Sequence, residues 1–207
     1  MKKQFFAAFL GTLMIANSVA WADGMTVIKE NNTVNVSLNA KPNTQTIMFV
    51  VEKGQSINDN QNILAVKEST ADKNGIAEFS FNMPEYKNGA SIDNQYDVYS
   101  TDNTAQPAGS FWYASTAHRN LVMTEIKNSQ SGLKDIFEGT KQIIDENQEQ
   151  LDNVTVLKAL DFDVDAYQAL SSEADKDKVF VLLSEIAGNI LQASDENIIK
   201  GFNDSVY

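Results

Sequence analysis

The spacing of apolar residues in this 207-residue chain changes near residue 114. Before that point apolar and polar residues alternate, as they do in Val34, Val36 and Leu38. Alternation of this kind is typical of a strand with one buried and one solvated face. After residue 114, apolar residues recur at helical spacing instead. The sequence therefore predicts an α+β chain, with strands in its first part and helices in its second.

Seven strands are predicted in the first part. Apolar alternation and the intervening turn sequences place them at residues 25–29, 33–40, 44–52, 62–68, 76–83, 95–100 and 109–113. The expected buried faces include Ile47, Phe49 and Val51 on one strand and Ala77, Phe79, Phe81 and Met83 on another. Seven short strands without a helical period favour an antiparallel β-sandwich of immunoglobulin type.

The second part is predicted to form a small helical bundle. We expect a helix at 116–129, a long helix, a short pair at 154–160 and 165–170, and two capped helices that begin after Ser172 and Ser194. The long helix would carry Leu133, Ile136, Phe137, Ile143, Ile144 and Leu151 on one stripe. The helix after Ser172 has the most regular stripe, from Val179 to Leu191, so Leu183 and Ile186 are predicted to be buried.

The first 22 residues are read as a secretory signal peptide. Lys2 and Lys3 precede an apolar run of about a dozen residues, and Ala20-Trp21-Ala22 has the small-x-small pattern of a cleavage site. A membrane anchor is the alternative, but Asn17 and Ser18 end the run before it could span a bilayer. We therefore expect a sandwich domain at 23–114 and a helical domain at 115–207. No flexible linker separates them, which predicts a stiff junction.

Composition excludes several classes of function. The formal net charge is −12, which disfavours binding to nucleic acid or to anionic lipid. The chain has no cysteine and one histidine, which removes thiolate sites, a cysteine nucleophile and multi-histidine metal sites. We expect no cofactor, and no stable membrane insertion after signal cleavage.

The sequence resembles a module of secreted and cell-surface proteins of Firmicutes, in which a bacterial Ig-like domain precedes a small helical domain. The resemblance rests on short segments: Phe111-Trp112-Tyr113-Ala114-Ser115, His118-Arg119-Asn120, Val156 to Asp163 with Tyr167 and Leu170, Asp177-Lys178-Val179, and Phe202 to Val206. Asp161 departs from it, because the family pattern has a glycine that ends a helix there. The resemblance implies a chain of several domains, often with S-layer homology domains, of which this would be the amino-terminal part. It implies no catalytic residue.

Three sets of polar residues are candidates for chemical sites. Asp161, Asp163 and Asp165 are spaced like the start of a calcium loop, but Ala166 and Ser172 stand where such a loop needs glycine and glutamate. The alternative is a turn in which Asp165 caps the next helix, with Gln168 as its partner. His118 lacks a nucleophile-elbow sequence and is expected to be solvated or to pack at the junction. The acidic residues could pair as in glycosidases, but a small sandwich and bundle leave little room for a cleft.

Aromatic residues near the end of the strand part are the remaining candidates. Trp112, Tyr96 and Tyr99 could contact a carbohydrate or a protein partner, and the alternative is packing against the helices. Strand alternation places Trp112 opposite Phe111 and Tyr113, which favours packing at the junction. We therefore expect a non-enzymatic structural or adhesion module, secreted or at a bacterial surface, whose partner is an extracellular protein or cell-wall polysaccharide. The alternative is a carbohydrate-binding accessory module of a secreted enzyme.

The cleavage pattern yields a direct prediction. The exported protein should begin at Asp23, because cleavage follows Ala22. Mass spectrometry of the protein recovered from the culture medium or cell surface measures this. An amino terminus that still carries Met1 to Ala22 would contradict it.

Overall fold

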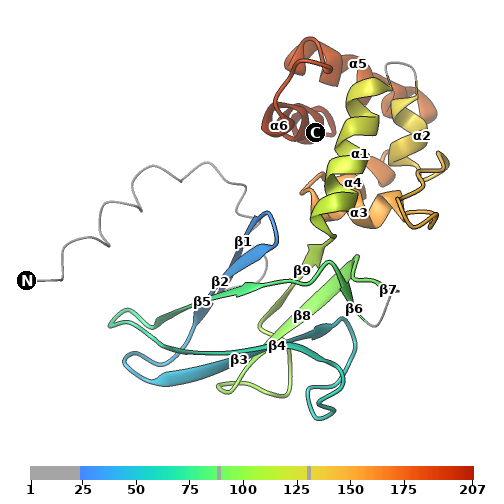
Figure 1. Ribbon diagram of the computed structural model, residues 1–207. Coiled ribbons are helices and arrows are strands. Elements are labelled where there is room, and N and C mark those ends of the chain that lie inside the picture. The colour runs from blue at the N-terminus through green and yellow to red at the C-terminus, as the bar shows by residue number, and fades with distance from the viewer. Residues whose placement is uncertain (1–23, 88–89, 130–131) are drawn as a thin grey trace, which may run out of the picture.

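The computed structural model describes residues 24–87, 90–129 and 132–207, so the predicted signal peptide lies outside the described residues. Antiparallel sheets over residues 25–113, here called the sheet region, are followed by a helical region over residues 116–205. Figure 1 shows the helices gathered at one end of the sheets, with α1 continuing from β9. The predicted α+β organisation and the order of its two parts are confirmed.

The sheet region contains all seven predicted strands. They are β1 (Met25–Glu30), β2 (Thr33–Asn39), β3 (Gln45–Glu52), β4 (Ile63–Thr70), β5 (Ile76–Asn82), β8 (Asn94–Ser100) and β9 (Gly109–Tyr113). A short pair, β6 (Tyr86–Lys87) and β7 (Ala90–Ser91), was not predicted, because two-residue strands carry no alternation. One sheet has the order β1-β2-β5 and the other the order β4-β3-β8-β9.

Residues from both sheets contribute to one hydrophobic cluster. On the three-stranded sheet, Val34 pairs with Phe81 and Val36 with Phe79, and all four side chains are buried. Met48, Val50, Tyr96 and Val98 of the four-stranded sheet belong to the same cluster. The strict alternation of β2 and β5 correctly identified their buried faces.

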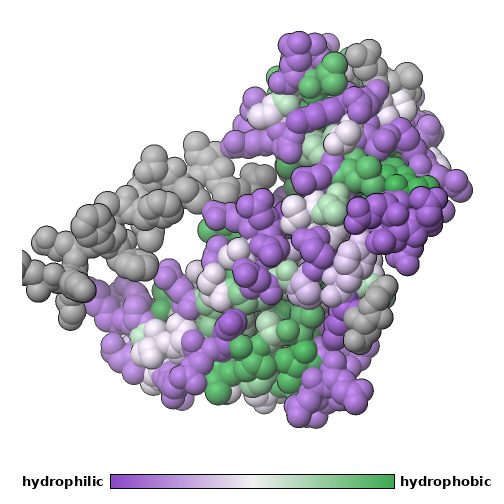
Figure 2. All heavy atoms as spheres, in the orientation of Figure 1, coloured by the Kyte–Doolittle hydropathy of each residue, from purple (hydrophilic) through white to green (hydrophobic). Residues whose placement is uncertain are grey.

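The predicted buried face of β3 is wrong. Met48 and Val50 belong to the cluster and Thr46 is also buried, whereas Ile47 and Phe49 are only partly buried on the other face of the sheet. The segment is apolar on nearly every residue, so alternation cannot select a face. A bulge between Val50 and Val51 also shifts the register, and Val51 is buried. Figure 2 shows apolar side chains gathered over β3 and β4 on the exposed surface.

The helical region contains six helices in the described residues. They are α1 (Thr116–Asn128), α2 (Leu133–Phe137), α3 (Asn153–Ala159), α4 (Val164–Gln168), α5 (Glu173–Ala187) and α6 (Asp195–Ser205). Ser172 accepts a hydrogen bond from Asp175 N and Ser194 accepts one from Asn197 N, at 3.1 and 3.2 Å. Both predicted caps are therefore confirmed.

The predicted long helix from Leu133 to Leu151 is wrong. Only α2 is helical, and the chain then turns at Gly139, whose φ of 73° is left-handed. A second turn follows, in which Asp145 accepts hydrogen bonds from Asn147 N and Glu149 N. Ile143 and Leu151 nevertheless reach the helical core from irregular backbone. Ile144, which was predicted on the same stripe, is 43% exposed, so that part of the prediction is wrong.

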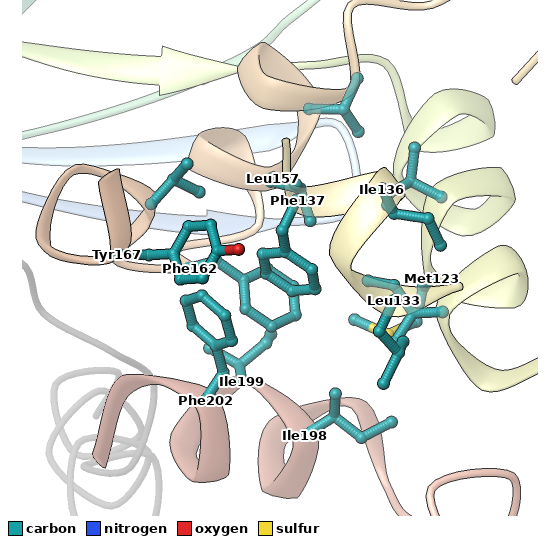
Figure 3. Packing of buried hydrophobic residues seen from close by; sticks show 14 of the residues in the cluster. Met123, Leu133, Ile136, Phe137, Leu157, Phe162, Tyr167, Ile198, Ile199 and Phe202 are labelled. Atoms are coloured by element: carbon teal, nitrogen blue, oxygen red, sulfur yellow. The ribbon is translucent and has the colours of Figure 1, made fainter. Parts of the chain in front are cut away.

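Aromatic rings fill the centre of the helical cluster. Phe137 of α2 stacks on Phe202 of α6 with ring centroids 4.2 Å apart, and Phe162 meets both rings edge to face (Figure 3). Tyr167 of α4 packs beside them. Rings from three separate segments thus hold α2, α4 and α6 around one point.

Helix α5 buries less than its stripe predicts. Leu183 is fully buried as expected, but Ile186 is 51% exposed, so that part of the prediction is wrong. The helix ends at Ala187 because Gly188 adopts a φ of 67°, and Leu191 therefore lies outside it. No helix in the described ranges is long and apolar enough to cross a bilayer.

The contrast along α5 can be measured. Leu183→Ala should lower the free energy of unfolding by about 2–5 kcal/mol, because it leaves a cavity in the helical core. Val181→Ala, at a position 58% exposed on the same helix, should change it by less than roughly 0.5 kcal/mol. Urea denaturation of both variants tests this, and equal effects would contradict the assigned burial.

Candidate functional site

Two residues connect the last strand to the first helix. Tyr113 ends β9, Ala114 and Ser115 follow, and α1 begins at Thr116. The Ser115 side chain caps α1 by accepting a hydrogen bond from His118 N at 3.1 Å. Ala114 and Ser115 are both fully buried. A buried, capped connection of this length leaves little freedom between the strand and the helix.

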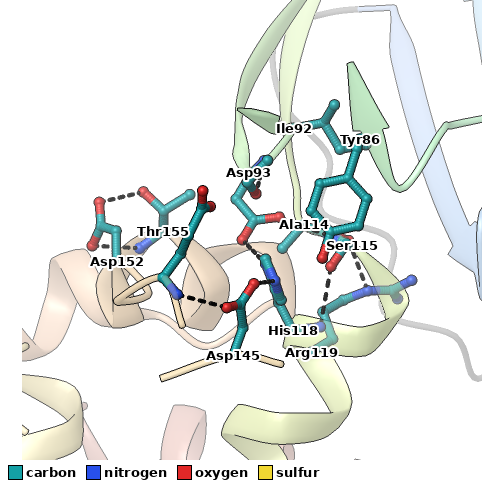
Figure 4. Close-up of polar contacts among 12 residues, drawn as sticks. Tyr86, Ile92, Asp93, Ala114, Ser115, His118, Arg119, Asp145, Asp152 and Thr155 are labelled. Carbon is teal, nitrogen blue, oxygen red and sulfur yellow. Dashed lines mark hydrogen bonds and ion pairs between the residues drawn. The ribbon is translucent and has the colours of Figure 1, made fainter. Parts of the chain in front are cut away.

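His118 is the centre of a polar cluster beside this connection. Its Nδ1 lies 2.5 Å from Asp93 Oδ2, and its Nε2 lies 3.2 Å from Asp145 Oδ2 (Figure 4). Asp93 belongs to the sheet region, between β7 and β8, and Asp145 to the helical region. The side chain of His118 is only 1% exposed, so it packs at the junction and is not solvated. It therefore joins the two regions.

The two carboxylates favour the charged form of this histidine. The hydrogen bond to Asp93 raises the pKa of His118 above its ordinary value, burial opposes this, and Asp145 adds to it. A hydrogen bond from Glu149 N lowers the pKa of Asp145, and His118 contributes further. An imidazolium donates from both ring nitrogens, which suits one carboxylate on each side.

Lys29 of β1 forms a second connection between the regions. Its ammonium donates to Ala159 O at 2.8 Å, to Asp161 Oδ1 at 2.6 Å and to Trp112 O at 3.3 Å. The Lys29 side chain is 9% exposed, and burial lowers its pKa. Its three donors are all used, so the buried charge is both paired and hydrogen-bonded.

Two further contacts surround the junction. Arg119 of α1 donates to Asn31 O in the turn between β1 and β2, and its Nε donates to Ala114 O at 3.1 Å. On another side, Asn147 Nδ2 donates to the hydroxyl of Tyr86 at 2.8 Å. Polar contacts therefore cross between the regions at several points around the short connection.

The three aspartates spaced like a calcium loop have other partners. Asp161 binds Lys29, Asp163 caps α4 by accepting from Ala166 N at 3.1 Å, and Asp165 lies 2.6 Å from Lys158 Nζ. The cap of α4 is thus Asp163, and the prediction that Asp165 fills this role is wrong. Asp161 has a φ of 67°, in the left-handed region that favours glycine. No cluster of metal-ligating residues is found among the described residues.

The three aromatic candidates are placed differently. Tyr96 is fully buried and donates to Ile92 O at 2.6 Å, so it offers no surface to a ligand. Tyr99 is partly exposed on the outer face of β8. Trp112 is also partly exposed, and it packs against the helical cluster while Phe111 and Tyr113 are buried in the sheet cluster. The predicted alternation along β9 is therefore observed.

A cleft of about 790 Å³ lies between the two regions. One wall comes from Gly109 to Trp112 of β9 with Lys53 and Gln95, and the other from Lys158 and the 161–165 segment. The small size of each part predicted little room for a cleft, but this cleft is lined by residues of both parts. The angle between the parts creates this space.

Sequence reasoning missed the partners of the junction. Lys29 lies 130 residues before its acceptor at Ala159, and His118 lies 25 residues from Asp93 and 27 from Asp145. The one sequence signal near the junction is that the single histidine and the single arginine of the chain are adjacent, close to the predicted boundary. No protein-family model matches this chain, and no curated protein shows significant similarity to it.

The His118 cluster predicts how stability depends on pH. Because its folded pKa is raised, His118 contributes fully below its unfolded pKa of about 6.5, and the contribution is lost as pH rises through the folded pKa. Asp145 has a lowered folded pKa, so its contribution is present above an unfolded value of about 3.9 and is lost as pH falls through the folded value. Stability from this cluster is therefore greatest between these two limits.

Urea denaturation from pH 4 to 10 tests this prediction, with wild type compared with His118→Gln. The wild-type advantage should be largest near pH 5–6 and decline at alkaline pH. Lys67→Gln, at an exposed residue of β4, serves as the control and should show no such pH dependence. A wild-type advantage that grows steadily toward pH 10 would contradict the charged state assigned to His118.

Proposed function

We propose that this chain is an exported, non-enzymatic structural or adhesion module of a bacterial surface or secreted protein. The observation that carries the proposal is the set of buried polar contacts across the junction, above all those of Lys29 and His118. They fix one region against the other. Two regions that act independently would not need a fixed angle between them. A fixed angle suits a module that presents a binding surface in a constant orientation, or one that keeps neighbouring domains at a set distance.

The polar residues that could have served catalysis are engaged in structure. Both ring nitrogens of His118 face carboxylates, and Asp161, Asp163 and Asp165 each bind a group of the chain itself. A general base needs an accessible position next to a reacting group. These side chains therefore support a structural role.

The fold that we propose for the sheet region is an Ig-like β-sandwich, with the helical region as a small bundle. Strand orders β1-β2-β5 and β4-β3-β8-β9 support it, as does the single hydrophobic cluster that both sheets share. This arrangement agrees with the resemblance to the Ig-like and helical modules of Firmicutes surface proteins. In that setting, further domains would hold the module at the cell wall.

A second candidate function is a carbohydrate-binding accessory module of a secreted enzyme. The specific observation in its favour is the cleft beside the partly exposed Trp112. Tyr96 does not contribute to it, because this ring is buried. The two candidate functions differ in the domain expected beside this module. A structural or adhesion module would accompany a wall-attachment domain, and a carbohydrate-binding module would accompany a catalytic domain.

Surface location tests the proposal. The full chain with an epitope tag after Tyr207 is expressed in the bacterium that encodes it, and protease is added to intact cells. The tag should be lost from the cells or recovered in the medium, while a cytoplasmic marker enzyme stays intact. A protein that remains inside intact cells and is protected from protease would contradict export and the proposed role.

A further inference from the structure

The cleft between the regions has the dimensions of a ligand site. Its volume of about 790 Å³ lies within the range of roughly 300–1,000 Å³ that is usual for small-molecule sites. Its lining combines β9 with Lys158 and the 161–165 segment, and the Lys29 ammonium contacts both sides through Trp112 O and Asp161 Oδ1. The cleft is therefore a built feature of the junction.

Trp112 lines this cleft with a partly exposed indole. Its side chain stands on the outer face of the four-stranded sheet, opposite Gln95 of β8. The ammonium of Lys158 lies 4.9 Å from the ring centroid, and its ion pair with Asp165 holds it there. This contact orients the indole, whose remaining exposed surface lines the cleft.

The charges that line the cleft balance each other. Three lysines, Lys29, Lys53 and Lys158, stand against three aspartates, Asp161, Asp163 and Asp165. Neither an anionic nor a cationic ligand gains from such a wall, and the net charge of −12 repels anions over a longer range. The lining favours a neutral ligand.

Donors and acceptors meet across the same space. Lys53 Nζ donates to Gln95 Oε1 at 2.8 Å, which leaves further N–H groups of the ammonium and the amide for a ligand. Carboxylates of the 161–165 segment form the opposite wall. A ligand whose groups both donate and accept fits this arrangement, and sugar hydroxyls do both. The apolar face of a sugar ring also suits the indole surface.

We propose that this cleft binds a neutral oligosaccharide, with Trp112 as the stacking surface and with Lys53 and Gln95 as hydrogen-bond donors. The inference rests on the proposed adhesion role and names the class of its partner. Acetylated amino-sugar chains of cell walls and plain glucans share this chemistry, so the experiment includes one probe of each kind.

Tryptophan fluorescence reports directly on the cleft. The chain has two tryptophans, Trp21 and Trp112, and a protein that begins at Asp23 keeps only Trp112. Titration with chitohexaose or with cellohexaose should produce a saturable change in its emission. Saturation with chitohexaose alone indicates an amino-sugar ligand, and saturation with cellohexaose alone indicates a glucan. An absence of saturable change with both probes at millimolar concentration overturns the proposal.

Calorimetry with substituted chains locates the binding. Trp112→Phe, Lys53→Met and Gln95→Ala should each weaken binding of the effective hexasaccharide at least tenfold, while Lys67→Met on β4 should leave it unchanged. Thermal melts of each variant confirm that it is folded. Equal loss in the Lys67→Met control, or tighter binding of anionic hexagalacturonate, would overturn the assignment of this cleft. A surface-located protein without such binding refutes the inference alone and leaves the proposed function standing.

Discussion

The buried ammonium of Lys29 is the interaction on which the arrangement of this molecule depends. It leaves β1, passes the edge of β9 and ends on the carbonyl of Ala159 and the carboxylate of Asp161. Burying a charge costs free energy unless each of its donors finds a partner, and here all three do. Lys29 therefore favours one angle between the sheets and the helices, because a different angle would leave its buried charge unpaired.

His118 completes this arrangement on another side of the junction. A histidine between two carboxylates tolerates neither the loss of its proton nor the removal of a partner without leaving an unpaired group. The contacts of Lys29 and His118 come from four separate stretches of chain. Together they determine the shape of the cleft, including the position of Trp112 beside Lys158.

The sequence predicted what depends on local periodicity. All seven main strands and both serine caps were predicted, because alternation and capping are properties of neighbouring residues. Periodicity failed where it was ambiguous, as in β3, whose two faces are both apolar. It also failed between Leu133 and Leu151, where helical spacing arises by coincidence in a chain that turns at Gly139. Periodicity could not predict the contacts of the junction for another reason. Lys29, Asp93 and Asp145 bind residues that are distant in the sequence, and local spacing carries no information about such pairs.

Tyr113 and Ala114 are consecutive in the chain, yet Tyr113 belongs to the sheet cluster and Ala114 to the helical cluster. The molecule thus has two apolar interiors, and consecutive residues from Phe111 to Ala114 pack alternately on one and the other. Energetic coupling between the two interiors therefore depends on the polar contacts of the junction and on Trp112. Loss of those contacts would lower the free energy of unfolding and would also uncouple the two interiors. The two interiors would then unfold in separate transitions, each with its own enthalpy and midpoint temperature.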